Sequence, residues 1–167
     1  HKVIGWMDCE FENNYSNRLE IVKIIGEAKP DIVFAPYYEN KHDHHNGGAH
    51  PDHLRCGLMI KDALRFARFK SILPDIKAHD VKKVYYYMVP KEEKPSFVID
   101  VSDVKEKLVE LMKCHESQMS IHRGKKKVLD MLNTYREITG LFAGSSFSEA
   151  FICEEILKTD VNALFTF

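Results

Sequence analysis

The chain of 167 residues, 44% of them hydrophobic, is large enough to form one domain, residues 1–167, with its own core. Its formal net charge of −1 gives no electrostatic reason to expect binding to nucleic acid or to an anionic membrane. We find no apolar run long enough to span a bilayer, no signal sequence, and no paired metal or redox spacing among the four cysteines, so we expect a cytoplasmic protein with reduced thiols.

The first half of the chain predicts a helix, a strand and a second helix. Ser16 is placed to cap a helix that ends near Ala28 and carries a broad apolar face. Residues 29–36 form an apolar run bounded by prolines, which is typical of a strand buried on both faces of a parallel sheet. Apolar residues then recur at helical spacing over residues 54–68, which predicts the second helix.

The second half of the chain predicts two strands followed by two helices. Residues 84–89 are rich in aromatic and β-branched side chains, and residues 97–101 form another such run. Ser102 is placed to cap the helix that follows. A last long helix is predicted through Ile138, with Gly140 as its stop.

The most informative stretch is His50-Pro51-Asp52-His53, where two imidazoles flank a carboxylate. Pro51 restricts its own backbone dihedral angles and those of the residue before it, so the backbone of this stretch is stiff. It follows a predicted parallel strand, and ligand sites of open α/β sheets form beyond the carboxyl ends of strands. Because imidazole serves both as a zinc ligand and in proton transfer, the stretch predicts a metal ligand and an acid in one place. The alternative is a coincidental pair of surface histidines.

Several motifs around this stretch resemble, in the same order, those of the LmbE-like (PIG-L) zinc-dependent de-N-acetylases. The resemblance covers nearly the whole chain and is strongest to the bacillithiol-biosynthesis branch. The motifs are Phe11-Glu12-Asn13-Asn14-Tyr15, Arg18-Leu19, Lys29-Pro30-Asp31-Ile32-Val33-Phe34-Ala35-Pro36-Tyr37, His50-Pro51-Asp52-His53, Phe97-Val98-Ile99-Asp100-Val101-Ser102-Asp103-Val104 and His115-Glu116-Ser117-Gln118.

The resemblance implies a fold and a reaction. The fold would be α/β, a Rossmann-like three-layer sandwich with a mostly parallel sheet, although this chain carries no dinucleotide fingerprint. The reaction would be removal of an N-acetyl group from an N-acetylglucosamine-type conjugate by a metal-activated water. The implied cofactor is Zn²⁺, although imidazole and carboxylate ligands also suit other divalent metals. The implied partners are a small N-acetylated amino sugar and, as a homo-oligomer, further copies of the chain.

The resemblance also implies roles for individual residues. His53 would ligate the zinc. His50 would stabilise the oxyanion or protonate the leaving amine, and Asp52 would hold or polarise His50. His115 would either face the substrate or bond a backbone carbonyl.

The chain departs from the family pattern at its start. Members of the family carry an early strand and an Ala-His-Pro-Asp-Asp loop with two zinc ligands and the general base, and we find no such loop here. We therefore expect the chain to be the C-terminal portion of the family domain, with the missing groups upstream of His1. The alternative is a non-catalytic binding or scaffolding relative.

A second departure is a histidine-rich insertion over residues 41–49, since four of the nine histidines fall between His42 and His50. It is either a polar loop over the site or a replacement metal site in which a nearby side chain joins His53. The candidates for that replacement are His42, Asp43, His44 and His45. Asp100 and Asp103 are alternative carboxylates for the missing base, but a capping role near the start of a helix is sufficient to explain both.

Overall fold

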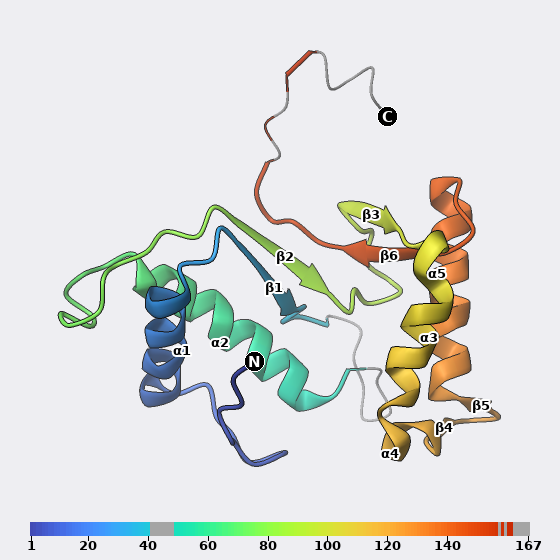
Figure 1. Ribbon diagram of the computed structural model, residues 1–167, viewed down its shortest axis with the longest axis horizontal. Helices are drawn as coiled ribbons and strands as arrows, with labels where there is room; N and C mark the ends of the chain where they lie inside the picture. Colours follow the sequence, from blue (N-terminus) through green and yellow to red (C-terminus); the bar gives the residue numbers. More distant parts are fainter. Residues whose placement is uncertain (41–48, 157, 159, 162–167) are drawn as a thin grey trace. The chain divides into compact units, whose positions relative to one another are not determined.

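The computed structural model describes residues 1–40, 49–156, 158 and 160–161. These residues form two compact units, one made of His1–Lys94 with Ile152–Phe167 and the other of Pro95–Phe151. Figure 1 traces their elements along the chain. The prediction that residues 1–167 form a single domain stays a prediction.

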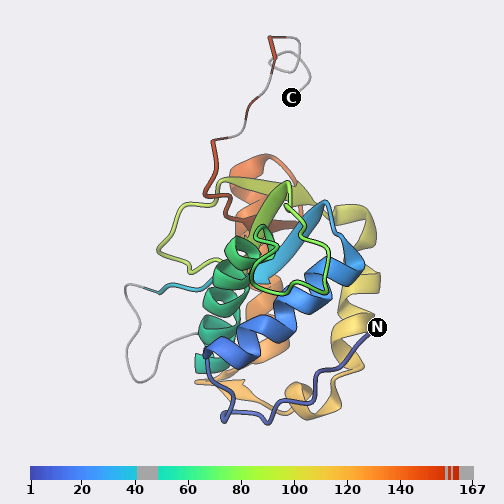
Figure 2. The same ribbon diagram turned by 90° about the vertical axis from the view of Figure 1, so that its left-hand side faces the viewer.

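The first unit contains a two-stranded parallel sheet covered by two helices. Its elements are α1 (Tyr15–Ala28), β1 (Ile32–Pro36), α2 (Pro51–Ala67) and β2 (Lys83–Tyr87). β1 and β2 run parallel, from Ile32 opposite Lys83 to Pro36 opposite Tyr87. Both views show α1 and α2 side by side on one side of the two strands (Figures 1 and 2).

The core of this unit lies between the helices and the sheet. Its buried members are Val22 and Ile25 of α1 and Ala63, Leu64 and Ala67 of α2. Val33 of β1 and Val84 of β2 pack against this cluster. Burying such side chains stabilises the unit by roughly 1.5–3 kcal/mol for each fully buried valine, leucine or isoleucine. The broad apolar face predicted for the first helix is therefore a face that buries this core.

Local hydrogen bonds decide where α1 begins and ends. The predicted cap at Ser16 is wrong, because the side chain of Asn14 accepts the Asn17 N–H at 2.9 Å and the helix begins at Tyr15. The helix ends at Ala28 as predicted. Lys29 takes a left-handed conformation, φ 47°, and donates its N–H to the Ile25 carbonyl at 2.8 Å.

A glycine lets α2 approach the end of β1. A Cβ added at Gly57 would lie 2.2 Å from the Pro36 carbonyl oxygen. At the other end of α2, Ala63 and Leu64 share the core cluster with Val33, near the start of β1. The helix therefore runs antiparallel to the strand, and its first turn lies beyond the strand's carboxyl end.

The last described part of the first unit is held to β2 and α2. Ile152 pairs with Tyr86 through two backbone hydrogen bonds of 2.9 Å. Glu154 accepts a bond from Lys61 of α2 at 2.8 Å, and Glu155 accepts one from Lys83 of β2 at 2.9 Å. The chain thus returns to the first unit after leaving it at Lys94.

The second unit is built around an antiparallel strand pair and a long helix. Its elements are β3 (Phe97–Asp100), η1 (Ser102–Val104), α3 (Lys105–Lys113), α4 (Glu116–Met119), β4 (His122–Arg123), β5 (Lys126–Lys127), α5 (Val128–Ala143) and β6 (Ser148–Phe151). β3 pairs antiparallel with β6, and β4 pairs antiparallel with β5. Arg136 of α5 forms an ion pair with Glu149 of β6 at 2.8 Å, which joins the helix to the strand.

The predicted stop of the last helix at Gly140 is wrong. α5 continues through Ala143 and ends at Gly144, whose φ of 77° is the left-handed conformation that glycine adopts without strain. Gly140 is a glycine for another reason. A Cβ there would lie 2.8 Å from both the Phe147 nitrogen and the Ser145 carbonyl oxygen, because the turn after the helix packs against it.

The predicted α/β class is confirmed, since helices combine with a small parallel sheet. Among the described residues, β1 and β2 form the parallel pair, while the other two strand pairs are antiparallel. The mostly parallel three-layer sandwich stays a prediction. No helix in the described parts of the chain is long and apolar enough to cross a membrane.

The close approach of α2 to β1 at Gly57 predicts how a substitution at this position changes the stability of the protein. We expect Gly57→Ala to lower the free energy of unfolding by about 1–3 kcal/mol, because the new methyl group meets backbone that cannot rotate away. This loss should exceed the gain of about 1 kcal/mol that alanine gives a helix over glycine. Urea unfolding monitored by circular dichroism measures the difference.

Gly26→Ala is the matched control. The Cβ added there most closely meets the Cγ2 atom of Ile76, which belongs to a side chain, and lies farther from the nearest backbone atom, the Lys77 carbonyl oxygen. It should therefore cost less than Gly57→Ala. Equal stability of the Gly57 variant and the unchanged protein would contradict the close approach of α2 to β1.

Candidate functional site

The predicted motif lies at the start of α2. His50 is the N-cap residue, with extended backbone at φ −70° and ψ 137°, and Pro51 occupies the first helical position, which its ring favours. Asp52 and His53 follow in the first turn, so both lie at the helix N-terminus. The helix begins at Pro51, three residues earlier than the apolar spacing indicated.

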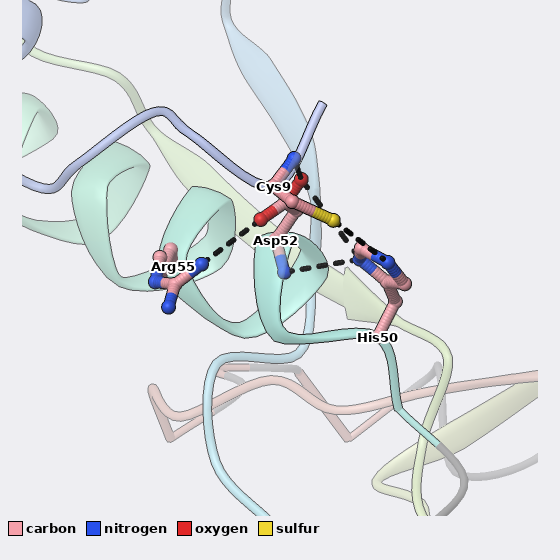
Figure 3. Close-up of polar contacts among 4 residues, drawn as sticks. All are labelled: Cys9, His50, Asp52 and Arg55. Atoms are coloured by element: carbon pink, nitrogen blue, oxygen red, sulfur yellow. Dashed lines mark hydrogen bonds and ion pairs between the residues drawn. The ribbon is translucent and has the colours of Figure 1, made fainter. Parts of the chain in front are cut away.

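The Asp52 carboxylate is the best-anchored group of the site. Asp52 is only 7% exposed. Its Oδ2 accepts the backbone N–H of Cys9 at 2.7 Å, and its Oδ1 accepts a bond from Arg55 at 3.0 Å (Figure 3). The Cys9 N–H, with smaller contributions from Asp8, His50 and Arg55, holds the pKa of the Asp52 carboxyl below its usual value. Asp52 is therefore ionised at neutral pH.

The His50 ring links Asp52 to Cys9. Its Nδ1 accepts the Asp52 N–H at 3.3 Å and lies 3.9 Å from the Asp52 Oδ2. When Nδ1 accepts a hydrogen bond, the neutral ring carries its proton on Nε2. That nitrogen lies 3.7 Å from the Cys9 sulfur. A carboxylate, an imidazole and a thiol thus follow one another across the first turn of α2, as Figure 3 shows.

His53 lies beside His50, with 5.9 Å between the ring centroids. It is an exposed residue, but the surrounding protein partly desolvates its ring. This desolvation, and the neighbouring His50, lower the pKa of His53. The imidazole is therefore neutral at pH 7, which is the form that binds a metal.

The structure adds two residues that the sequence did not single out. Within the described residues, Asp8, Cys9 and His50 offer metal-ligand atoms that all lie within 4.8 Å of one another. Forty-one positions separate Cys9 from His50, and no spacing rule connects them. Desolvation and the negative charges of Asp8 and Asp52 raise the pKa of the Cys9 thiol, so it is neutral at pH 7.

The other candidate residues lie elsewhere. His115 belongs to the second unit, where it is exposed and directly precedes α4 without a side-chain cap bond, and its substrate-binding role stays a prediction. Asp100 of the second unit accepts bonds from the N–H and hydroxyl of Ser102 at 2.9 and 2.6 Å. These hydrogen bonds give the Asp100 side chain a structural role in the turn at Ser102. The candidate ligands at residues 42–45 lie outside the described residues.

No protein-family model matches the chain. The chain is 29% identical over 120 residues to a diacetylchitobiose deacetylase of Thermococcus kodakarensis. That match covers 66% of this chain and 40% of the relative, so the chain spans well under half of the length of that protein.

Three solved structures resemble the protein. The match to the conserved protein TT1542 of Thermus thermophilus has a TM-score of 0.78 and 19% sequence identity. It covers 93% of this chain and 66% of that protein. The match to the N,N′-diacetylchitobiose deacetylase of Pyrococcus horikoshii, complexed with its inhibitor MPG, has a TM-score of 0.74 and 22% sequence identity. It covers 89% of this chain and 54% of that protein. The chain has the fold of these proteins.

The third structure limits what the fold can say about the reaction. It is the 4-carboxy-2-hydroxymuconate hydratase GalB of Pseudomonas putida, matched with a TM-score of 0.72 and 14% sequence identity. The match covers 92% of this chain and 64% of that protein. One fold therefore carries different reactions, and the reaction has to be argued from the site. A deacetylase relative and a deacetylase neighbour agree with the predicted resemblance, while its bacillithiol branch stays a prediction.

The lowered pKa of Asp52 predicts how stability depends on pH. A carboxyl whose pKa is lower in the folded state stabilises that state above its unfolded pKa of about 3.9. We expect the difference in unfolding free energy between the unchanged protein and Asp52→Asn to stay constant from pH 7 to about pH 5. It should shrink at lower pH, as Asp52 becomes protonated. Chemical denaturation across this range measures it.

Asp103→Asn, which removes an exposed carboxylate from the second unit, is the control for the loss of one charge. A difference between Asp52→Asn and the unchanged protein that stays constant down to pH 2 would show that the Asp52 carboxylate does not stabilise the folded state through its charge.

Proposed function

We propose that the protein acts in the hydrolysis of an N-acetyl group on an N-acetylglucosamine-type conjugate. The observation that carries the proposal is the His50 ring beyond the carboxyl end of β1, whose Nδ1 accepts the N–H of the buried Asp52 and whose Nε2 can therefore carry a proton. The similarity to diacetylchitobiose deacetylases supports an amide of an amino sugar as the substrate. The substrate is then a small molecule, and its aglycone is left open.

His50 and Asp52 have complementary tasks in this reaction. Hydrolysis breaks the C–N bond of the amide, adds water, and yields acetate and a free amine. The departing nitrogen needs a proton, which the Nε2 of His50 can donate from the imidazolium form of the ring, leaving the neutral ring. Asp52 is a positioning residue, because its backbone N–H sets the ring orientation and its carboxylate lies 3.9 Å from Nδ1.

The metal set implied by the family resemblance is only partly present. A catalytic zinc needs about three protein ligands, and among the described residues no second or third member of that set accompanies His53. The described residues therefore do not complete the implied site. If Zn²⁺ or another divalent ion is held by His53 and further residues, it would polarise the amide carbonyl and acidify a bound water.

A second function is a binding protein that has lost catalysis. Such a protein would bind the sugar conjugate without hydrolysing it. A replacement metal site built from residues 42–45 stays a further hypothesis. Location in the cytoplasm and assembly as a homo-oligomer also stay proposals.

Release of acetate from N,N′-diacetylchitobiose and from N-acetylglucosamine conjugates tests the proposed reaction, with added Zn²⁺ and with a chelator. We expect His50→Ala to lower kcat by roughly 10²- to 10⁴-fold, the usual contribution of a positioned acid. His122→Ala, an exposed histidine of the second unit, should leave kcat unchanged.

Sugar binding measured on the same proteins separates the two functions. Binding without acetate release in the unchanged protein would favour the non-catalytic relative. Acetate release that survives His50→Ala would refute the assigned role of His50.

A further inference from the structure

The loop before α1 brings a thiol and a carboxylate to the first turn of α2. The backbone N–H of Cys9 is bound to the buried Asp52 carboxylate at 2.7 Å, which holds the loop against the helix. The Cys9 sulfur then lies 3.7 Å from the His50 Nε2. Asp8 adds a carboxylate oxygen, and the three ligand atoms lie within 4.8 Å of one another.

This spacing suits a tetrahedral metal ion. Zinc binds sulfur at about 2.3 Å and nitrogen or oxygen at about 2.0–2.2 Å, so two ligands of one ion stand roughly 3.5 Å apart. The sulfur and the imidazole nitrogen already have that separation. All three residues are exposed, so an ion can reach them from solution, and small side-chain movements bring Asp8 into the same shell.

Asp52 can support His50 as a ligand. Binding through Nε2 requires the ring proton to move to Nδ1, which then gives up the Asp52 N–H and can turn toward the Asp52 Oδ2, 3.9 Å away. A ligating histidine commonly donates its other N–H to a carboxylate, which orients the ring and makes it a better ligand. The Cys9 thiol loses its proton to solvent on binding.

We propose that Asp8, Cys9 and His50 form a binding site for Zn²⁺ or a similar divalent transition-metal ion, with a thiolate, an imidazole and a carboxylate as ligands. A mixed sulfur and nitrogen donor set prefers Zn²⁺ and Co²⁺ over Mg²⁺ or Ca²⁺. The ligand set differs from the one implied by the family resemblance, which uses His53 and contains no thiol.

The site shares His50 with the proposed acetyl-group hydrolysis. A metal on Nε2 takes the position of the proton that His50 would donate, so occupation of this site should inhibit the reaction. That consequence rests on the proposed function. Metal binding itself does not, and it is measured without any substrate.

Titration of the whole chain with Co²⁺, followed by absorption spectroscopy, tests the site. A cobalt ion bound to a thiolate gives an intense charge-transfer band in the near ultraviolet, which carboxylate and imidazole ligands do not give. We expect one saturable band in the unchanged protein that Zn²⁺ abolishes by displacing the cobalt. Asp8→Asn should weaken cobalt binding by roughly tenfold or more.

Cys9→Ser should remove the band while keeping the backbone N–H that binds Asp52. Its matched control is Cys114→Ser, another exposed cysteine, which should leave the band unchanged. His53→Ala should also leave the band in place. The absence of a band in the unchanged protein, or a band that survives Cys9→Ser, would overturn the site. Loss of the band in His53→Ala would overturn His50 as the imidazole ligand.

Discussion

The Asp52 carboxylate is the constraint on which the site depends. It is buried at the positive end of the α2 dipole and accepts a hydrogen bond from a loop that precedes α1. A buried carboxylate without donors would be strongly destabilising, so its partners must stay in place for the fold to tolerate it. The same bonds orient His50 through the Asp52 N–H and bring Cys9 to the ring.

The helix that carries Asp52 is in turn placed by packing. Gly57 allows α2 to lie directly on the Pro36 carbonyl, and the shared core of α1, α2 and the two parallel strands holds the rest of the helix. A side chain at position 57 would push the helix outward, and the groups of its first turn would move with it. Stability of the first unit and geometry of the site are thus linked through one close contact.

The fold restricts the function less than the site does. The neighbours with this fold include a deacetylase and a hydratase, whose reactions differ in the bond that is broken. What favours amide hydrolysis here is the paired Asp52 and His50, together with the deacetylase relative. The presence of Cys9 and Asp8 beside the same histidine adds a second chemical use for that ring, in which it binds a metal ion.

The sequence alone determined the local features. Apolar spacing and proline positions predict α1, β1 and α2, and the order His50-Pro51-Asp52-His53 places a cap, a first helical residue and two titratable groups at one helix end. These depend on neighbours a few residues apart. The stop at Gly144 did not follow, because Gly140 is a glycine for its packing against the turn after the helix and does not end it. The contacts of Cys9 with Asp52 and His50 did not follow either, because they join distant segments of the chain. Only the tertiary structure decided that Cys9 lies beside His50. The two residues are 41 positions apart, and no local sequence pattern sets the distance between them.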